Sequence, residues 1–102
     1  MTMLEKPIHV FSKWRIKKAH FNTVYDLLNK VAMQSVLQNG NLFYKAHRCK
    51  EDQHTIIVFE GYIDENSRQL QRSSAHFKNL IEGKIMPLLE YQEVISTTPL
   101  IR

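Results

Sequence analysis

The residues that cross-link chains, cradle phosphates or hold metals are scarce in this sequence. Cys49 is the single cysteine among 102 residues, which excludes an intrachain disulfide and a disulfide-stapled secreted scaffold. The three glycines form neither a phosphate-binding loop nor a nucleophile elbow. The five histidines show no helical metal-ligand spacing such as i, i+4. We therefore expect the purified protein to carry no metal, haem or flavin as a cofactor.

Long apolar runs are also absent. No segment approaches the roughly 18 apolar residues that a membrane helix needs. Glu5, Lys6 and Pro7 precede the first apolar run, which is not the pattern of a signal peptide. We expect a single domain over residues 1–102, with no membrane contact and a cytoplasmic location.

The net charge of +4 raises the question of a nucleic-acid partner. The basic residues are dispersed, and the densest group consists of Lys13, Arg15, Lys17 and Lys18. No aromatic binding platform alternates with that group, so we expect no nucleic-acid partner. A surface basic enough to attract a small anionic molecule stays open as an alternative.

Hydrophobic periodicity predicts six elements. Alternation predicts strands, and apolar residues three and four apart predict helices. The predicted order is a strand at 7–16, a helix from 20 to about 38, strands at 41–49 and 54–63, a helical region at 64–86 and a strand at 90–98. Gly40 is expected to close the first helix, and Asp64 to cap the second. Ser73 and Ser74 are expected to divide the second helical region.

This order predicts an α+β fold of the ferredoxin-like type. The short polar turn at 50–53 joins its flanking strands as an antiparallel hairpin. The helices then act as right-handed crossovers, which gives the split βαβ, or βαββαβ, arrangement. We expect a four-stranded antiparallel sheet with both helical regions on one face.

The second face of that sheet is expected to be dry as well. Residues 56–59, "IIVF", are apolar on both sides of their strand, and Phe11 lies on the opposite side from Val10 and Trp14. A strand with one wet face should alternate apolar and polar residues. We therefore expect a homodimer in which two copies pack sheet to sheet.

Three segments carry a family resemblance: "WRIKKAHFNTVYDLL", "NGNLFYKAHR" and "IIVFEGYIDENSRQLQRSSAHFKNL". With them the chain resembles the antibiotic biosynthesis monooxygenase domain, a dimeric α/β-barrel superfamily, from about Ile8 to Thr98. The last segment is similar to the family's strand ending in Glu and an aromatic residue, followed by a helix that carries His-Phe.

Two departures from the family pattern bear on function. Many members have tryptophan in place of Tyr62 and histidine in place of Gln71. The haem-degrading branch uses asparagine, tryptophan and histidine at positions that fall here at Ser12, Gln71 and Ile81. All three are missing, so haem degradation is poorly supported.

The resemblance implies an oxygenase that uses neither metal nor flavin. Such members hold a phenol or quinol between sheet and helices, and its anion reacts with molecular oxygen. That chemistry needs a dry cavity, a base or hydrogen-bond acceptor, and donors for developing charge. The implied catalytic candidates are His76, Tyr62 and Tyr44, and the implied substrate-binding candidates are Trp14, Ser12 and Glu60.

Each candidate has a plainer interpretation. His76 is either a group at a cavity rim or a helix residue bonded to solvent, and the resemblance favours the cavity. Tyr44 and Tyr62 are either hydroxyl donors or core aromatics. Glu60 is expected to form an ion pair with Arg15 or Arg48, because a carboxylate in so apolar a strand needs a partner.

We therefore expect a homodimeric, cofactor-independent monooxygenase of a small aromatic phenol or quinol. An isomerase of a small carbonyl metabolite, built on the same scaffold, is one alternative. A ligand-binding or interaction module without turnover is the other, because one fold hosts many functions.

Overall fold

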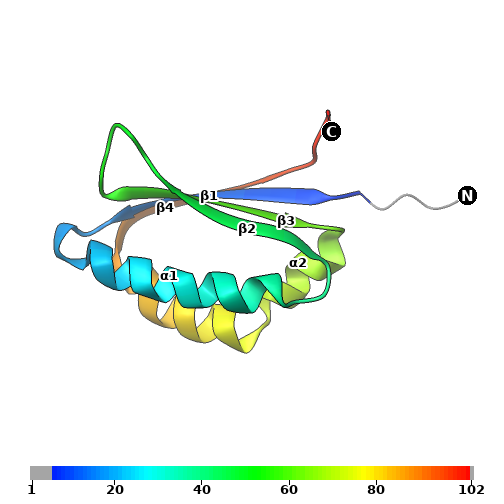
Figure 1. Ribbon diagram of the computed structural model, residues 1–102, viewed down its shortest axis with the longest axis horizontal. Coiled ribbons are helices and arrows are strands. Elements are labelled where there is room, and N and C mark those ends of the chain that lie inside the picture. The colour runs from blue at the N-terminus through cyan, green and yellow to red at the C-terminus, as the bar shows by residue number, and fades with distance from the viewer. Residues whose placement is uncertain (1–5, 102) are drawn as a thin grey trace, which may run out of the picture.

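The backbone of residues 6–101 forms one antiparallel sheet whose helices lie on a single face, as a computed structural model shows (Figure 1). The elements are β1 (Ile8–Ile16), η1 (Lys18–His20), α1 (Phe21–Val36), β2 (Asn41–Arg48), β3 (Thr55–Tyr62), α2 (Glu65–Arg72), η2 (Phe77–Ile85), η3 (Met86–Leu88) and β4 (Leu89–Thr97). Glu5 of the opening segment lies outside the described residues, as do residues 1–4 and 102.

The strand order across the sheet is β2-β3-β1-β4, and every neighbouring pair is antiparallel. This order confirms the predicted ferredoxin-like βαββαβ fold, in which each helical connection carries the chain across the sheet. Between residues 6 and 101 no helix is long and apolar enough to cross a membrane.

The predicted cap at Asp64 is confirmed, whereas α1 ends at Val36, four residues before Gly40, so Gly40 forms the turn into β2 and does not close the helix. The Asp64 carboxylate accepts a hydrogen bond from the Ser67 N–H at 2.8 Å and so caps α2. Gly40 has φ +85° and lies against Ser67, where a Cβ atom would collide with the serine hydroxyl. Between α2 and η2, Ser74 ties the two pieces together through hydrogen bonds at both ends, donating to Gln71 O and accepting from Phe77 N–H.

The core lies between the inner face of the sheet and the helices. Trp14 and Ile16 of β1 and Val58 of β3 are almost completely buried against α1 and η2. The facing helical residues are Val24, Leu28 and Val31 of α1 and Ile81 and Ile85 of η2. Each such side chain stabilises the fold by roughly 1.5–3 kcal/mol through burial.

The outer face of the sheet carries an aromatic cluster that the helices do not cover, and we call it the outer aromatic face. Its members are His9, Phe11, Phe43 and Phe59. Phe11 and Phe59 are stacked with ring centroids 4.5 Å apart, and Phe43 lies 4.6 Å from Phe59. Gly61 provides the room for the Phe43 ring, because a Cβ atom there would lie 2.4 Å from it. In Figure 1 the β2–β3 hairpin tip and the C-terminal segment both rise on this side.

Candidate active site

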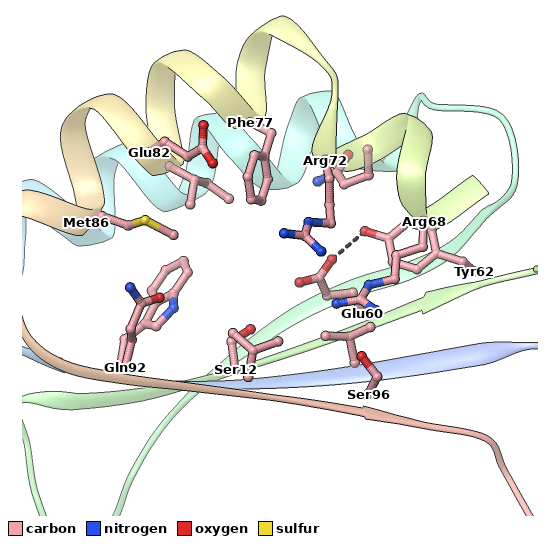
Figure 2. Close-up of a pocket in the computed structure, with 15 residues that line it drawn as sticks. Ser12, Glu60, Tyr62, Arg68, Arg72, Phe77, Glu82, Met86, Gln92 and Ser96 are labelled. Carbon is pink, nitrogen blue, oxygen red and sulfur yellow. Dashed lines mark hydrogen bonds between the residues drawn. The ribbon is translucent and has the colours of Figure 1, made fainter. Parts of the chain in front are cut away.

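A cavity of about 330 Å³ opens between the inner face of the sheet and the α2–η2 layer (Figure 2). A volume of this order lies at the lower end of the range for small-molecule sites. Its lining consists of Val10, Ser12, Trp14, Glu60, Tyr62, Arg68, Gln71, Arg72, Phe77, Ile81, Glu82, Met86, Gln92, Val94 and Ser96.

The strand register builds the floor of the cavity. Trp14 pairs with Gln92 of β4, whereas Val10, four residues earlier on β1, pairs with Glu60 of β3 and with Ser96 of β4. A strand rises about 3.3 Å per residue, so the Trp14 end and the Glu60 end lie roughly 13 Å apart. The cavity is therefore elongated along β1.

The two ends differ in chemistry. At the Trp14 end, Met86 and Phe77 extend toward the floor from the helical layer, and Gln92 and Glu82 add polar groups to this mainly aromatic slot (Figure 2). At the other end the labelled side chains of Arg68 and Arg72 point from α2 toward Glu60 (Figure 2). The site thus combines an aromatic slot with a charged end.

The helical roof of the cavity is a π-helix. In η2 the backbone bonds run from residue i to i+5, a widened turn that is frequent at functional sites. Phe77, Ile81 and Met86, at spacings of four and five residues, follow this turn and all face the cavity. A helix with 3.6 residues per turn would not keep all three in the same line.

Glu60 and Tyr62 form a hydrogen-bonded pair at the charged end. They lie two residues apart on β3 and so share the inner face, where the Tyr62 hydroxyl donates to the Glu60 carboxylate. Burial raises the pKa of Glu60, and the hydrogen bond from Tyr62 and the charge of Arg68 offset part of that rise. Burial, together with the charge of Glu60, also raises the pKa of Tyr62, which stays a neutral donor. Glu60 is therefore a more basic carboxylate than usual.

The structure corrects the expected partner of Glu60. Arg15 lies on the outer face and pairs instead with Asp52, at 3.4 Å. Arg48 donates to the Gln53 carbonyl at 2.8 Å, and its guanidinium lies 3.9 Å from the ring centroid of Phe21. The prediction of an ion pair with either arginine is wrong.

His76 is not among the residues that line the cavity, and its ring instead approaches Ser35 of α1. Its Nε2 is 2.9 Å from Gln71 Oε1, 3.3 Å from Ser74 Oγ and 3.5 Å from Ser35 Oγ. The Gln71 amide in turn donates to Ser35 Oγ at 2.7 Å. Since Gln71 Oε1 can only accept, Nε2 of His76 carries the proton. Burial lowers the pKa of His76.

The structure places some of the candidate residues predicted from the sequence at the cavity and the others away from it. Ser12, Trp14, Glu60 and Tyr62 all line the cavity. The prediction that Tyr44 and His76 face the same cavity differs from what is observed. Tyr44 is on β2, which α1 covers, so its ring belongs to the core. His76 reaches the cavity only indirectly, through Gln71.

Sequence reasoning missed Arg68, Arg72, Glu82, Met86 and Gln92. The signal for the two arginines was present, because residues four apart share a helix face. The signal for Glu82 of η2 and for Met86, which follows it in η3, was absent, because a wider helical turn leaves no mark in an apolar pattern.

Fold and cavity together define a ferredoxin-like α+β protein with a cavity of small-molecule size between its sheet and its helices. The profile of the antibiotic biosynthesis monooxygenase family matches residues 7–83, and the chain belongs to that family. No curated protein matches the chain.

Solved structures show the same fold. A Bacteroides thetaiotaomicron protein, provisionally described as an antibiotic biosynthesis monooxygenase, is 26% identical with a TM-score of 0.85; the match covers 94% of this chain and 91% of that one. A Mycobacterium tuberculosis protein is 18% identical with a TM-score of 0.88, and covers 94% and 97%. A Nitrosomonas europaea protein, also described provisionally as such a monooxygenase, is 12% identical with a TM-score of 0.87, and covers 98% and 96%.

Proposed function

We propose that this protein is a cofactor-independent monooxygenase of a small aromatic phenol or quinol. One observation carries the proposal: the Glu60 carboxylate, made more basic by burial, lines one end of the cavity whose other end is the aromatic slot, and it holds a hydrogen bond from Tyr62. Family membership supports the reaction class.

Glu60 acts as the general base in this proposal. A phenol has a pKa near that of tyrosine, about 10, so an ordinary carboxylate is a weak base toward it. Raising the pKa of Glu60 narrows this gap and favours proton transfer in the transition state. Tyr62 keeps the carboxylate oriented and supplies a neutral hydrogen bond.

The overall reaction balances without an external reductant. The substrate gives its phenolic proton to Glu60, and the electron-rich anion reacts with molecular oxygen at a ring carbon. One oxygen atom replaces the hydrogen on that carbon as a carbonyl, and the other leaves as water with two protons and two electrons from the substrate. The apolar wall of Trp14, Phe77 and Met86 excludes bulk water from the anion.

The protein in this proposal is a homodimer joined through the outer aromatic face. Phe11 is 37% exposed and Ile95, its cross-strand neighbour on β4, is 49% exposed. Contiguous apolar surface of this kind is typical of an interface. The raised hairpin tip and C-terminal segment, which carries the exposed Leu100 and Ile101, would flank a second copy (Figure 1). Cys49 is a free thiol, which fits the reducing cytoplasm.

An isomerase is the second candidate function. The same Glu60–Tyr62 pair offers a base and a neutral donor, which are the groups needed to move a proton next to a carbonyl. A module that binds a ligand without turnover is the third. Neither alternative consumes oxygen, and this difference separates them from the proposal.

Oxygen uptake with labelled oxygen tests the proposed reaction. Purified protein is incubated with a panel of naphthols and hydroxyanthracenes under ¹⁸O₂, and the products are analysed by mass spectrometry. We expect one oxygen molecule consumed and one labelled atom incorporated per product. Uptake no faster than without protein, across the whole panel, would overturn the monooxygenase; an unlabelled rearranged product would favour the isomerase.

A further inference from the structure

We infer that Arg68 and Arg72 form a carboxylate-binding site at one end of the cavity, so that the substrate is an aromatic carboxylic acid. The claim that the aromatic acid is a substrate rests on the proposed function, whereas the claim that the arginines bind its carboxylate does not. It names the chemical group that orients the aromatic ring against Glu60.

The first observation is the placement of the two arginines. They lie four residues apart on α2, so their side chains leave the same face of the helix. Both line the cavity, and in Figure 2 both guanidinium ends lie beside the Glu60 carboxylate, Arg72 from above and Arg68 from below it. Two guanidinium groups at one end of a small cavity form a concentrated positive charge.

The second observation concerns their partners. Within the described residues 6–101, the ion pairs involve Arg15, His54 and Asp52, and none involves Arg68 or Arg72. Among residues 6–101, no side-chain hydrogen bond involves either guanidinium. Each guanidinium has five donors in a rigid fork that matches a carboxylate. The full donor set is therefore available to a ligand.

The charges at this end leave a positive balance. Both labelled arginines point toward Glu60 in Figure 2, and this carboxylate accepts the hydrogen bond of Tyr62 and interacts electrostatically with Arg68. Two arginines against one ionised glutamate leave a net charge of about +1, and +2 once Glu60 takes up a proton from the substrate. Glu82 extends from η2 on the other side of Phe77 (Figure 2). A ligand carboxylate would offset this charge.

The length of the cavity then determines how large a ring system the ligand can carry. The arginine end lies at Val10 and Ser96, and the aromatic slot at Trp14 and Gln92, roughly 13 Å along β1. A ring system of two fused rings with a carboxylate at one end spans most of this length. Smaller aromatic acids would reach one end only.

Calorimetric titration with a matched pair of probes tests the site. The probes are 2-naphthoate and 2-naphthamide, which share shape and differ in charge. Charge-assisted hydrogen bonds are about twice as strong as neutral ones, so we expect naphthoate to bind at least about 10-fold more tightly than naphthamide. Raising the salt concentration should weaken naphthoate alone, because salt screens charge.

Substitutions of the two arginines test whether they cause the preference for naphthoate. In Arg68→Gln/Arg72→Gln the preference for naphthoate should fall to about 1–2-fold, whereas Lys30→Gln, which removes an exposed charge from α1, should keep it. The single variant Arg72→Gln, at an exposed position, should give an intermediate ratio and guards against misfolding of the double variant. Equal affinity of the two probes for the wild type, no binding of either, or a preference that survives the double variant would overturn the site.

The two proposals can fail separately. Binding of naphthoate needs no oxygen and no turnover, so the carboxylate site can stand if oxygen uptake fails. Conversely, oxygen uptake with neutral naphthols but no preference for naphthoate would retain the monooxygenase and remove the carboxylate site.

Discussion

The Tyr62 hydroxyl donates its hydrogen bond to Glu60 from two residues along the same strand, so one face of β3 carries both a base and the donor that orients it. This hydrogen bond lowers the pKa of Glu60, while burial raises it by more. The basicity of the carboxylate is therefore raised by burial and lowered by two contributions, the hydrogen bond of Tyr62 and the charge of Arg68, and a single substitution can remove the Tyr62 contribution.

Tyr62→Phe should raise the pKa of Glu60 further, because the hydrogen bond that stabilises the carboxylate is lost while burial remains. A general base must be deprotonated, so the acid limb of the pH profile of kcat/KM should move to higher pH. The free energy of unfolding should fall by about 1 kcal/mol for the lost hydrogen bond. Tyr25→Phe, at an exposed position on α1, is the control and should leave the profile in place. An unshifted acid limb in Tyr62→Phe would count against Glu60 as the base.

Glu60→Gln should lower turnover of an accepted phenol by roughly 10²-fold or more, since the amide keeps the shape and loses the base. At neutral pH the same substitution should stabilise the folded protein. The folded pKa of Glu60 lies above the ordinary value of 4.5, so the wild type loses stability as pH rises from 4.5 through the folded pKa. The variant lacks this loss, and urea unfolding at pH 4 and pH 7 should show it gaining on the wild type at pH 7. Glu90→Gln, at an exposed position, should change neither quantity.

Tyr44→Phe should leave stability unchanged or raise it by up to about 1 kcal/mol, because a buried hydroxyl without a partner costs free energy. The Tyr44 hydroxyl is buried and has no hydrogen-bond partner among the described residues. Burial and the charge of Glu60 raise the pKa of this phenol, so it stays protonated. Thermal unfolding measures the change. A loss of more than about 1 kcal/mol would mean that the hydroxyl is hydrogen-bonded in solution, for instance to a buried water.

His76→Gln should remove one source of pH-dependent stability. The folded pKa of His76 is below its ordinary value of 6.5, so the unfolded chain takes up a proton first as pH falls through 6.5, and the wild type loses stability there. Unfolding at pH 7.5 and pH 5.5 should show a smaller loss in the variant. His47→Gln, exposed on the outer face of β2, is the matched control and should behave as the wild type. Equal losses in wild type and His76→Gln would contradict the expected shift.

Phe59→Lys should dissociate the proposed dimer, because an unpaired charge buried in an interface costs several kcal/mol. Phe59 lies at the centre of the outer aromatic face, in contact with His9, Phe11 and Phe43. Sedimentation at micromolar concentration should show a dimer for the wild type and a monomer for the variant. Ile95→Lys, at the rim, should weaken the dimer without disturbing the stack, and Met33→Lys on α1 should leave it intact. A monomeric wild type would remove the dimer.

Much of the fold was readable from the sequence because its signals are local. Alternation and helical spacing identify the elements, Asp64 caps α2, Gly40 forms the turn into β2, and the short turn after β2 forces a hairpin. Only part of the cavity lining could be predicted from the sequence. Neighbouring helical residues point about 100° apart, so an inward Phe77 places His76 on a flank, but nothing local decides which flank. The flank is set by where α1 packs, and α1 supplies Ser35 to the histidine side.

The alternation of β1 has an evolutionary consequence. Ser12 lies on the cavity floor, while its neighbours Phe11 and Lys13 face the other way, so adjacent codons specify two separate surfaces. A mutation at Ser12 can alter ligand preference without changing the outer aromatic face, and a mutation at Phe11 can alter that face without reshaping the cavity. Selection can therefore act on the two surfaces independently, within a single nine-residue strand.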